Sequence, residues 1–415
     1  RTLTGHAPLS SIGIPSTSAE QAARAVAMDN IPGLAPRRAA LTLLDAVTRR
    51  GLPLESALGN ATRGLAKPED KALARAIASE TLRRLPDLDA LIDSATRQVL
   101  PHDSKARMVL RMALAQVLVM ETPEHAAVST ALPLVDGGPR RLVHGVLGTL
   151  LRQKAVLPAL PTLPDQVRLR WDDALVAIAS AAMIEPPVID LTLRDGTETD
   201  LWAERLGGES LMPGHVRIAR GPAIAGLPGF TEGAWWVQNI AASLPARLLG
   251  PGNGRTVLDL CAAPGGKTMQ LAAAGWTVTA LDQDRARLVR LEDNLARTGL
   301  SARLVTADLM RWEPAEPVPA ILLDAPCSAT GIFTRHPDVL YRVRPSDIAQ
   351  LAELQAAMIA RVATWLQPGG TLIYNSSLVL AAVARPEILA LPIPASAIAG
   401  ELGNAKLLNM VLLGA

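Results

Sequence analysis

The chain has 415 residues, 49% of them hydrophobic and 19% charged, which is enough for two or three folded domains. A net charge of +2 permits a nucleic-acid partner without demanding one. The two cysteines exclude a disulfide scaffold and a four-thiolate zinc site; we expect no metal, and a reducing, cytoplasmic location. No apolar run reaches the ~18 residues of a membrane span, so we expect no membrane partner.

The N-terminal third divides into an arm and a helical region. Residues 1–33 are rich in Ser, Ala, Pro and Gly without a clear period, which predicts a flexible arm. From residue 34 to residue 155 apolar residues recur at helical spacing, which predicts five or six helices with short links, an all-α bundle. We expect these helices at residues 38–47, 70–85, 88–99, 104–120, 126–135 and 140–152.

Adjacent arginines recur in this bundle. The pairs are Arg37-Arg38, Arg49-Arg50, Arg83-Arg84 and Arg140-Arg141. Guanidinium groups bind phosphate in bidentate fashion, so such pairs could bridge successive phosphates of a nucleic acid. The alternative is a solvated surface, on which arginines near helix ends complement the helix dipole.

Residues 156–230 predict a connector and a small α+β subdomain. A proline-rich stretch at 157–164 is followed by a helix expected to run through Trp171 and Ala177 and to end at Pro186-Pro187. Strands are then expected at 188–193 and 215–218, with a helix at 200–206 between them.

Residues 231–415 predict an α/β domain with a Rossmann-like, mostly parallel sheet, because strand and helix alternate from Val257 onward. The run Val257–Leu260 leads into the turn Cys261-Ala262-Ala263-Pro264-Gly265-Gly266-Lys267, and a helix is expected from Thr268 onward. Glycines let backbone N–H groups approach a ligand closely, and a helix N-terminus favours polar or anionic atoms. The turn therefore predicts a nucleotide pocket.

Three later strands end in acids. The strand at 278–281 ends at Asp282, roughly the ~20-residue offset at which an acid binds a ribose diol. The strands at 304–307 and 320–323 end at Asp308 and Asp324. These acids could instead be helix caps. A nicotinamide-dependent dehydrogenase is the competing enzyme class, but the turn lacks the three-glycine form that accommodates a pyrophosphate, and Pro264 stands in its middle.

Three blocks, in this order, resemble one enzyme family. They are Asp259–Lys267, Asp324–Gly331 with its Pro326-Cys327 pair, and Arg335–Asp338. Together they are similar to the S-adenosylmethionine-dependent RNA cytosine-5 methyltransferases of the RsmB/Sun type. Residues 122–128 and 142–147 resemble the NusB-type RNA-binding domain that precedes the catalytic part in that family.

The resemblance implies an S-adenosylmethionine site formed by residues 261–267, Asp282, Asp308 and Asp324. It also implies a sheet of seven strands, a partial RNA-recognition fold in the small subdomain, and a role for Lys267 in positioning acidic groups or RNA. The implied substrate is a cytosine of small-subunit ribosomal RNA. We expect a monomer.

The region before the turn departs slightly from the family pattern. The family usually has Gln-Asp where this chain has Gln238-Asn239, which removes a carboxylate near the cofactor edge. The neighbouring Trp235 and Trp236 are predicted to be packing groups rather than base-stacking platforms, because buried Trp mainly fills apolar space.

The catalytic cysteines depart further. In this family one cysteine, in the Pro-Cys block, assists release, and a second, in a later Thr-Cys block, attacks C6 of the base. Cys327 matches the first, but the later block has Ser376 and Ser377 at the Thr and Cys positions. A serine hydroxyl is not ionised near neutral pH without a strong base. Cys327 is therefore the one thiol expected to meet the base.

Three explanations of Ser377 remain open. Cys327 could have taken over the attack; the chain could be a catalytically silent member that still binds RNA and cofactor, as a ribosome-assembly factor would; or the sequence could be altered or incomplete there. A methyltransferase acting on protein or small molecules is a more distant alternative, because small substrates need no helical appendage with arginine pairs.

Overall fold

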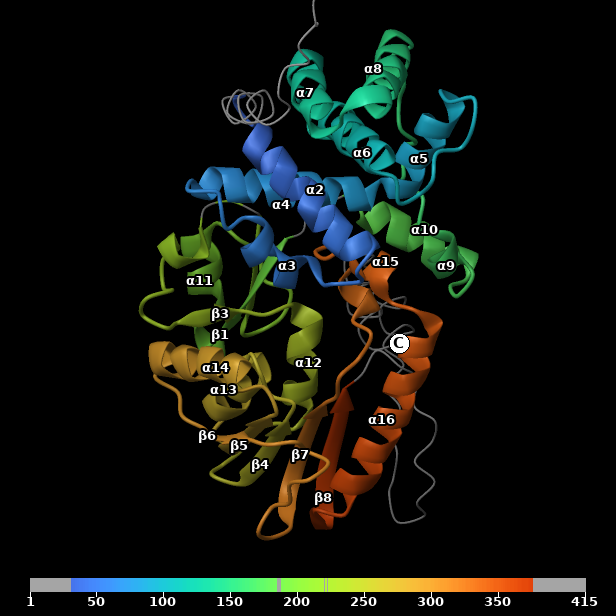
Figure 1. Ribbon diagram of the computed structural model, residues 1–415. Helices are drawn as coiled ribbons and strands as arrows, with labels where there is room; N and C mark the ends of the chain where they lie inside the picture. Colours follow the sequence, from blue (N-terminus) through green and yellow to red (C-terminus); the bar gives the residue numbers. More distant parts are fainter. Residues whose placement is uncertain (1–30, 185–187, 220, 222, 376–415) are drawn as a thin grey trace, which may run out of the picture. The chain divides into compact units, whose positions relative to one another are not determined.

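The computed structural model describes residues 31–184, 188–219, 221 and 223–375. Its contacts divide the chain into two units, residues 1–159 and 160–415, and each is described by itself (Figure 1). No helix within the described ranges is long and apolar enough to cross a membrane.

The N-terminal unit is the expected all-α bundle. Its helices are α2 (Leu34–Thr48), α3 (Leu54–Ala61), α4 (Pro68–Arg83), α5 (Leu85–Ser94), α6 (Lys105–Leu118), α7 (Glu124–Ala131) and α8 (Gly137–Arg152), with a 3-10 turn at Leu132–Leu134. The described part of the unit thus holds seven α-helices, and the expectation of five or six was wrong. The missed helix is α3, which buries only Leu54 and Ala57 and so shows little apolar period.

Helix α6 lies at the centre of this bundle and is buried from Ala106 to Gln116. Its two buried arginines are held by acids of α5. The Arg107 guanidinium donates to Asp89 and to both carboxylate oxygens of Asp93 at 2.8 Å, and Arg111 donates to both oxygens of Asp89. Bidentate pairing of this kind offsets the cost of removing the guanidinium groups from water and fixes α5 against α6.

The C-terminal unit opens with two short helices, α9 (Asp165–Arg168) and α10 (Asp173–Ala182), where one helix through Trp171 was expected. That expectation was wrong because Asp172 begins a new helix: its carboxylate accepts from the Leu175 N–H at 2.7 Å. Trp171 lies between the helices and packs on Phe333, with ring centroids 5.9 Å apart.

A small antiparallel sheet follows, in the order β2-β1-β3. Its elements are β1 (Ile189–Leu193), a 3-10 turn at Gly196–Glu198, α11 (Thr199–Leu206), β2 (His215–Ile218), a 3-10 turn at Ile224–Gly226, and β3 (Trp235–Val237). The two predicted strands and the helix are confirmed, whereas β3 was not anticipated. Trp235 and Trp236 are buried, as packing groups should be.

Asp190 of β1 ties this sheet to the next helix, α12 (Ile240–Leu248). Its fully buried carboxylate accepts from Arg217 of β2 at 2.7 Å and 3.1 Å, from Asn239 at 3.2 Å, and from the Ile240 N–H at 3.0 Å. Burial alone would raise the pKa of Asp190, but the neighbouring His215 imidazole and the hydrogen bonds from Arg217 and Ile240 outweigh it and hold the pKa below its usual range.

The larger sheet is parallel, with the strand order β6-β5-β4-β7-β8. The elements are β4 (Thr256–Leu260), α13 (Gly266–Ala273), β5 (Thr277–Asp282), α14 (Arg285–Thr298), β6 (Arg303–Thr306), β7 (Val318–Asp324), a 3-10 turn at Thr330–Ile332, α15 (Val339–Arg342), α16 (Pro345–Ala363) and β8 (Leu366–Asn375). The expected Rossmann-like class is confirmed. Five strands of this sheet lie within the described residues, and the implied total of seven stays an expectation. Strand β6 ends two residues before Asp308.

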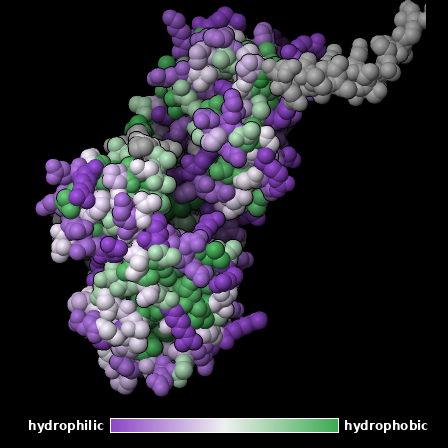
Figure 2. Space-filling view, turned by 90° about the vertical axis from the view of Figure 1, so that its left-hand side faces the viewer, coloured by the Kyte–Doolittle hydropathy of each residue, from purple (hydrophilic) through white to green (hydrophobic). Residues whose placement is uncertain are grey.

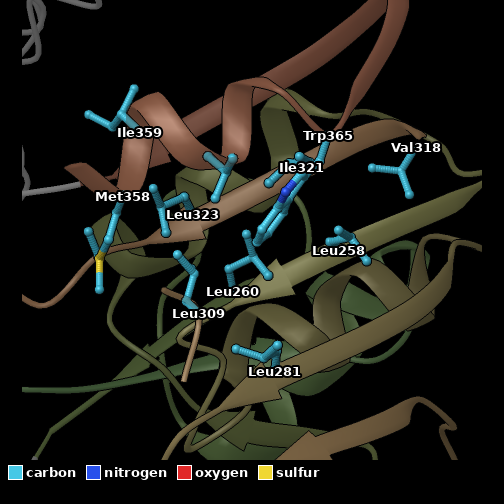
Figure 3. Packing of buried hydrophobic residues seen from close by; sticks show 12 residues of the cluster. Leu258, Leu260, Leu281, Leu309, Val318, Ile321, Leu323, Met358, Ile359 and Trp365 are labelled. Atoms are coloured by element: carbon cyan, nitrogen blue, oxygen red, sulfur yellow. The ribbon is translucent and has the colours of Figure 1, made fainter. Parts of the chain in front are cut away.

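Helix α16 packs against one face of this sheet. Leu258, Leu260, Ile321 and Leu323 of the central strands pack with Met358 and Ile359 of the helix, and Trp365 closes the cluster (Figure 3). Burial of these side chains fixes the strand ends on which the site is built. On the outer surface, Figure 2 shows hydrophilic side chains over much of the face it displays, with apolar patches between them.

Candidate active site

The carboxyl ends of four parallel strands meet at one edge of the larger sheet. Leu260 at the end of β4 pairs with Leu281 of β5 and with Leu323 of β7, and Asp324 pairs with Asn375 of β8. The residues that follow these strand ends are therefore brought together, at the edge where open α/β sheets bind ligands.

The glycine turn after β4 has a backbone that ordinary residues disfavour. Cys261 has φ 62° and Gly265 has φ 104°. A Cβ built on Gly265 would lie 2.0 Å from Leu291 Cδ1, so only glycine fits there. Helix α13 begins directly at Gly266, two residues earlier than expected, and the first N–H groups of a helix have no partner within it.

Asp282 braces this turn from β5. One carboxylate oxygen accepts from the Ala263 N–H at 3.1 Å and the other from the Asp284 N–H at 2.9 Å. Arg287 of α14 lies 3.6 Å from the first oxygen and also donates to the Ala263 carbonyl. The carboxylate is almost fully buried, so it shapes the loop as well as lining the edge.

Asp324 is held from two directions at the end of β7. Lys267 Nζ, from the first turn of α13, lies 2.6 Å from its Oδ2, and Asn375 Nδ2 donates to its Oδ1 at 2.7 Å. The Lys267 side chain is only 10% exposed. Sequence reasoning placed Lys267 and Asp324 in the site but missed Asn375, whose bond depends on the pairing of β7 with β8.

Asp259 inside β4 is a further group that sequence reasoning did not single out. It is fully buried, Thr268 Oγ1 donates to its Oδ2 at 2.5 Å, and its Oδ1 has no partner within the described residues. Burial, with added repulsion from Asp324 and Asp282, raises the pKa of Asp259 to about 7. The sequence alone did not indicate a functional role for Asp259, since a single acid inside an apolar strand can equally be a structural group.

The two cysteines lie in different environments. Burial, together with the nearby carboxylates of Asp282 and Asp324, raises the pKa of Cys261 to about 12, so its thiol stays protonated near neutral pH. Cys327 is half-buried and follows Pro326, whose carbonyl accepts a hydrogen bond from Gln355 of α16. Ser377, the position at which the resemblance implies a second cysteine, lies outside the described residues.

Asp308 lies apart from this cluster of bonds. It follows the end of β6, its side chain is 45% exposed, and its carboxylate accepts from the Met310 N–H at 2.9 Å. The structure thus shows a turn-forming contact at Asp308. Among the described residues no group of His, Cys, Asp and Glu could hold a metal ion.

The predicted RNA-contacting arginines differ in their surroundings. Arg37 is buried and donates to Gln116 at 2.8 Å. Arg83 pairs with Glu80, and Arg84 donates to the Pro158 carbonyl at 2.9 Å. Three further arginines, Arg38, Arg140 and Arg141, belong to exposed positions. The last two stand in the first turns of α8.

Comparison with known proteins identifies both parts of the chain. Residues 34–152 match the family model described as the NusB family, and residues 246–385 match that of the 16S rRNA methyltransferase RsmB/F. The ribosomal RNA small subunit methyltransferase B of Xylella fastidiosa strain Temecula1 is 34% identical over 399 residues, covering 90% of this chain and 92% of that protein. The protein of the same name from Klebsiella pneumoniae strain 342 is 35% identical over 342 residues, covering 75% and 79%.

Among solved structures, that of PH0851 matches with a TM-score of 0.62 at 21% identity, covering 84% of this chain and 87% of that one. A likeness at this identity shows a shared fold.

Proposed function

The chain belongs to the RsmB/Sun family of S-adenosylmethionine-dependent small-subunit ribosomal RNA methyltransferases, and on that premise we propose that it methylates C5 of a cytosine in that RNA. The observation that carries the proposal is the position of Cys327. It follows Asp324 by three residues in the segment after β7, and Lys267 and Asn375 hold the Asp324 carboxylate in place.

The residues at this edge fit S-adenosylmethionine. The ligand carries a sulfonium and an ammonium group, and the carboxylates of Asp282 and Asp324 lie at this edge with Arg287 and Lys267 as their cationic partners. The Oδ1 of Asp259 is buried and has no hydrogen-bond partner within the described residues, so a polar group of a bound ligand could bond to it. We assign cofactor binding to residues 261–267, Asp282, Asp308 and Asp324; when bound, the cofactor supplies an electrophilic methyl group.

Cys327 supplies the nucleophile in this account. Its thiolate forms a bond to C6 of cytosine, and the electron pair of the C5–C6 double bond moves to C5, which becomes able to accept a methyl group. After transfer the C5 proton passes to a basic group of the site, the double bond reforms, and the bond between Sγ and C6 breaks. The protonated thiol of Cys261 cannot serve in this way.

Asp324 positions the base. Each of its oxygens already accepts one hydrogen bond and retains a second lone pair, which can accept from the exocyclic amino group of cytosine. Lys267 and Asn375 fix the plane of the carboxylate, so the acceptor is oriented before the RNA binds.

The helical bundle supplies RNA binding in this proposal. Arg38, Arg140 and Arg141 have the exposure that phosphate contacts need, whereas Arg37 and Arg83 are buried and Arg84 is half-buried. We propose that the chain acts as a monomer, in the cytoplasm, where its RNA is assembled into ribosomes.

A family member that binds RNA and cofactor without turnover is a second candidate, and Ser377 favours it, because the resemblance implies a cysteine there. Incubation of undermethylated small-subunit ribosomal RNA with the chain and methyl-labelled S-adenosylmethionine separates the two. The proposal expects 5-methylcytosine in the digested RNA. Retention of RNA and cofactor with no label in any nucleoside would favour the silent member, and label in a nucleoside other than cytosine would refute both.

A further inference from the structure

Gln355 stands out on the buried face of α16. That face consists of Gln355, Met358, Ile359 and Val362, and the last three belong to the apolar core under the sheet. Gln355 itself is 2% exposed. A buried amide costs free energy unless its donor and acceptor are both satisfied, and an apolar side chain of similar length would avoid that cost.

The amide joins two segments that lead to the proposed catalytic groups. Gln355 Nε2 donates to the carbonyl of Pro326, the residue before Cys327, and its Oε1 accepts from the Tyr374 hydroxyl at 2.7 Å. The direction of both bonds is fixed, because a backbone carbonyl can only accept and so must face the amide nitrogen. Tyr374 lies on β8, one residue before Asn375.

The bond to Pro326 controls the one backbone torsion that remains free there. The proline ring fixes φ, so the orientation of the Pro326–Cys327 peptide plane depends on ψ of Pro326. Holding the carbonyl oxygen holds that plane, and with it the Cα of Cys327. The two preceding residues are also anchored, since Asn375 donates to Asp324 and the Ala325 N–H donates to the Asn375 carbonyl at 3.3 Å.

We infer that Gln355 is a positioning residue for Cys327. Its hydrogen bonds to Tyr374 of β8 and to the Pro326 carbonyl fix the segment that carries the thiol relative to β8. The inference rests on the proposed function for its effect on turnover, but the position of the thiol can be measured without turnover. Gln355 does not touch substrate or cofactor in this account.

Three variants separate the bond to Pro326 from the bond to Tyr374. Gln355→Met keeps the length and removes both; Gln355→Glu keeps an acceptor for Tyr374 and, when ionised, has no donor for Pro326; Tyr374→Phe removes only the hydroxyl. Gln350→Met is the matched control, because Gln350 is an exposed glutamine of the same helix.

The first readout is the rate at which iodoacetamide alkylates Cys327 in the full chain, followed by mass spectrometry, which distinguishes label on Cys327 from label on Cys261. We expect Gln355→Met and Gln355→Glu to change the Cys327 rate by about threefold or more, Tyr374→Phe by less, and Gln350→Met not at all. Cofactor affinity and thermal midpoint serve as checks that the fold is kept.

The second readout is methyl transfer. We expect Gln355→Met to lower kcat by about tenfold with KM for RNA and cofactor within about twofold, because a displaced nucleophile slows the chemical step more than binding. An unchanged alkylation rate in both Tyr374→Phe and whichever Gln355 variant folds would overturn the inference. If Cys327→Ala keeps the parent rate while Gln355→Glu still alters alkylation, the proposed nucleophile is wrong and the positioning role stands.

Discussion

Lys267 and Asp324 form an ion pair across the carboxyl edge of the parallel sheet, with Lys267 Nζ 2.6 Å from Asp324 Oδ2. The lysine comes from the first turn of α13, which is an unfavourable helix end for a cation, and the acid comes from the end of β7. The Asp324 carboxylate provides the electrostatic stabilisation of the Lys267 ammonium that this end of the helix dipole does not provide. Each group is therefore placed by the other, and the pair joins the glycine turn to the segment that carries Cys327.

Removing the charge of Asp324 should reduce turnover strongly while the fold remains. Asp324→Asn keeps the shape but leaves the largely buried Lys267 ammonium without its counter-ion. We expect kcat to fall by about a hundredfold, since the base loses its oriented acceptor. Steady-state methyl transfer measures this, with Asp293→Asn on the exposed face of α14 as control. A fall of less than threefold would remove Asp324 from the catalytic account.

Asp259 should make stability depend on pH. Its folded pKa of about 7 lies above the ordinary value of 3.8, so between these values the folded state binds more protons than the unfolded state. The unfolding free energy must then fall as pH rises from about 4 to about 7 and level off above it. Asp259→Asn should remove this fall, and at pH 8 should be more stable than the parent by about 2–4 kcal/mol. Denaturant titrations at several pH values test this; a constant difference between the two proteins would contradict it.

Asp190 should show the opposite pH dependence. Its pKa is held below 3.8 in the folded state, so its stabilising contribution is complete above that value and is lost as pH falls below it. Asp190→Ala leaves Arg217 buried without its carboxylate and should cost about 3–5 kcal/mol at pH 7, and less near pH 3. Chemical unfolding measures the loss, and Asp200→Ala, an exposed acid of α11, is the control. Equal losses at both pH values would show that the ion pair is not the cause.

Arg140 and Arg141 should contribute phosphate contacts. The double variant Arg140→Ala/Arg141→Ala should weaken binding to ribosomal RNA fragments and reduce the slope of log K against log salt by about one to two units. Arg49→Ala/Arg50→Ala is the matched pair, because those arginines already pair with Asp45. An unchanged slope in the first variant would place the RNA elsewhere.

Much of the larger sheet could be predicted because β4, β5 and β7 are short apolar runs that end in an acid or a glycine turn. Gly265 is a clear case. The strand that precedes it and the paired glycines predict a tight turn, and its φ of 104° is a turn conformation that glycine adopts readily. Strand β3 could not be predicted, because three residues are too few for an alternating pattern. Its position depends on pairing with β1, more than forty residues earlier in the chain.

The site was harder to predict where it depends on contacts distant in sequence. Asn375 reaches Asp324, 51 residues earlier, only because β8 pairs with β7. Arg37 looked like a surface cation, yet it lies against Gln116, 79 residues later. A prediction from composition or spacing uses only residues that are close in sequence, so it cannot distinguish a buried guanidinium from one in solvent. The glutamine that binds Pro326 escaped notice for the same reason.

The central claim is that Cys327 attacks the base in a chain whose residue 377 is a serine. Methyl transfer from S-adenosylmethionine to ribosomal RNA by the chain as it stands, Cys327→Ala and Ser377→Cys tests it most directly. The account predicts a measurable rate that Cys327→Ala abolishes, because a serine hydroxyl is almost wholly protonated near neutral pH. A rate that survives Cys327→Ala, or one that appears only after Ser377→Cys, would contradict it.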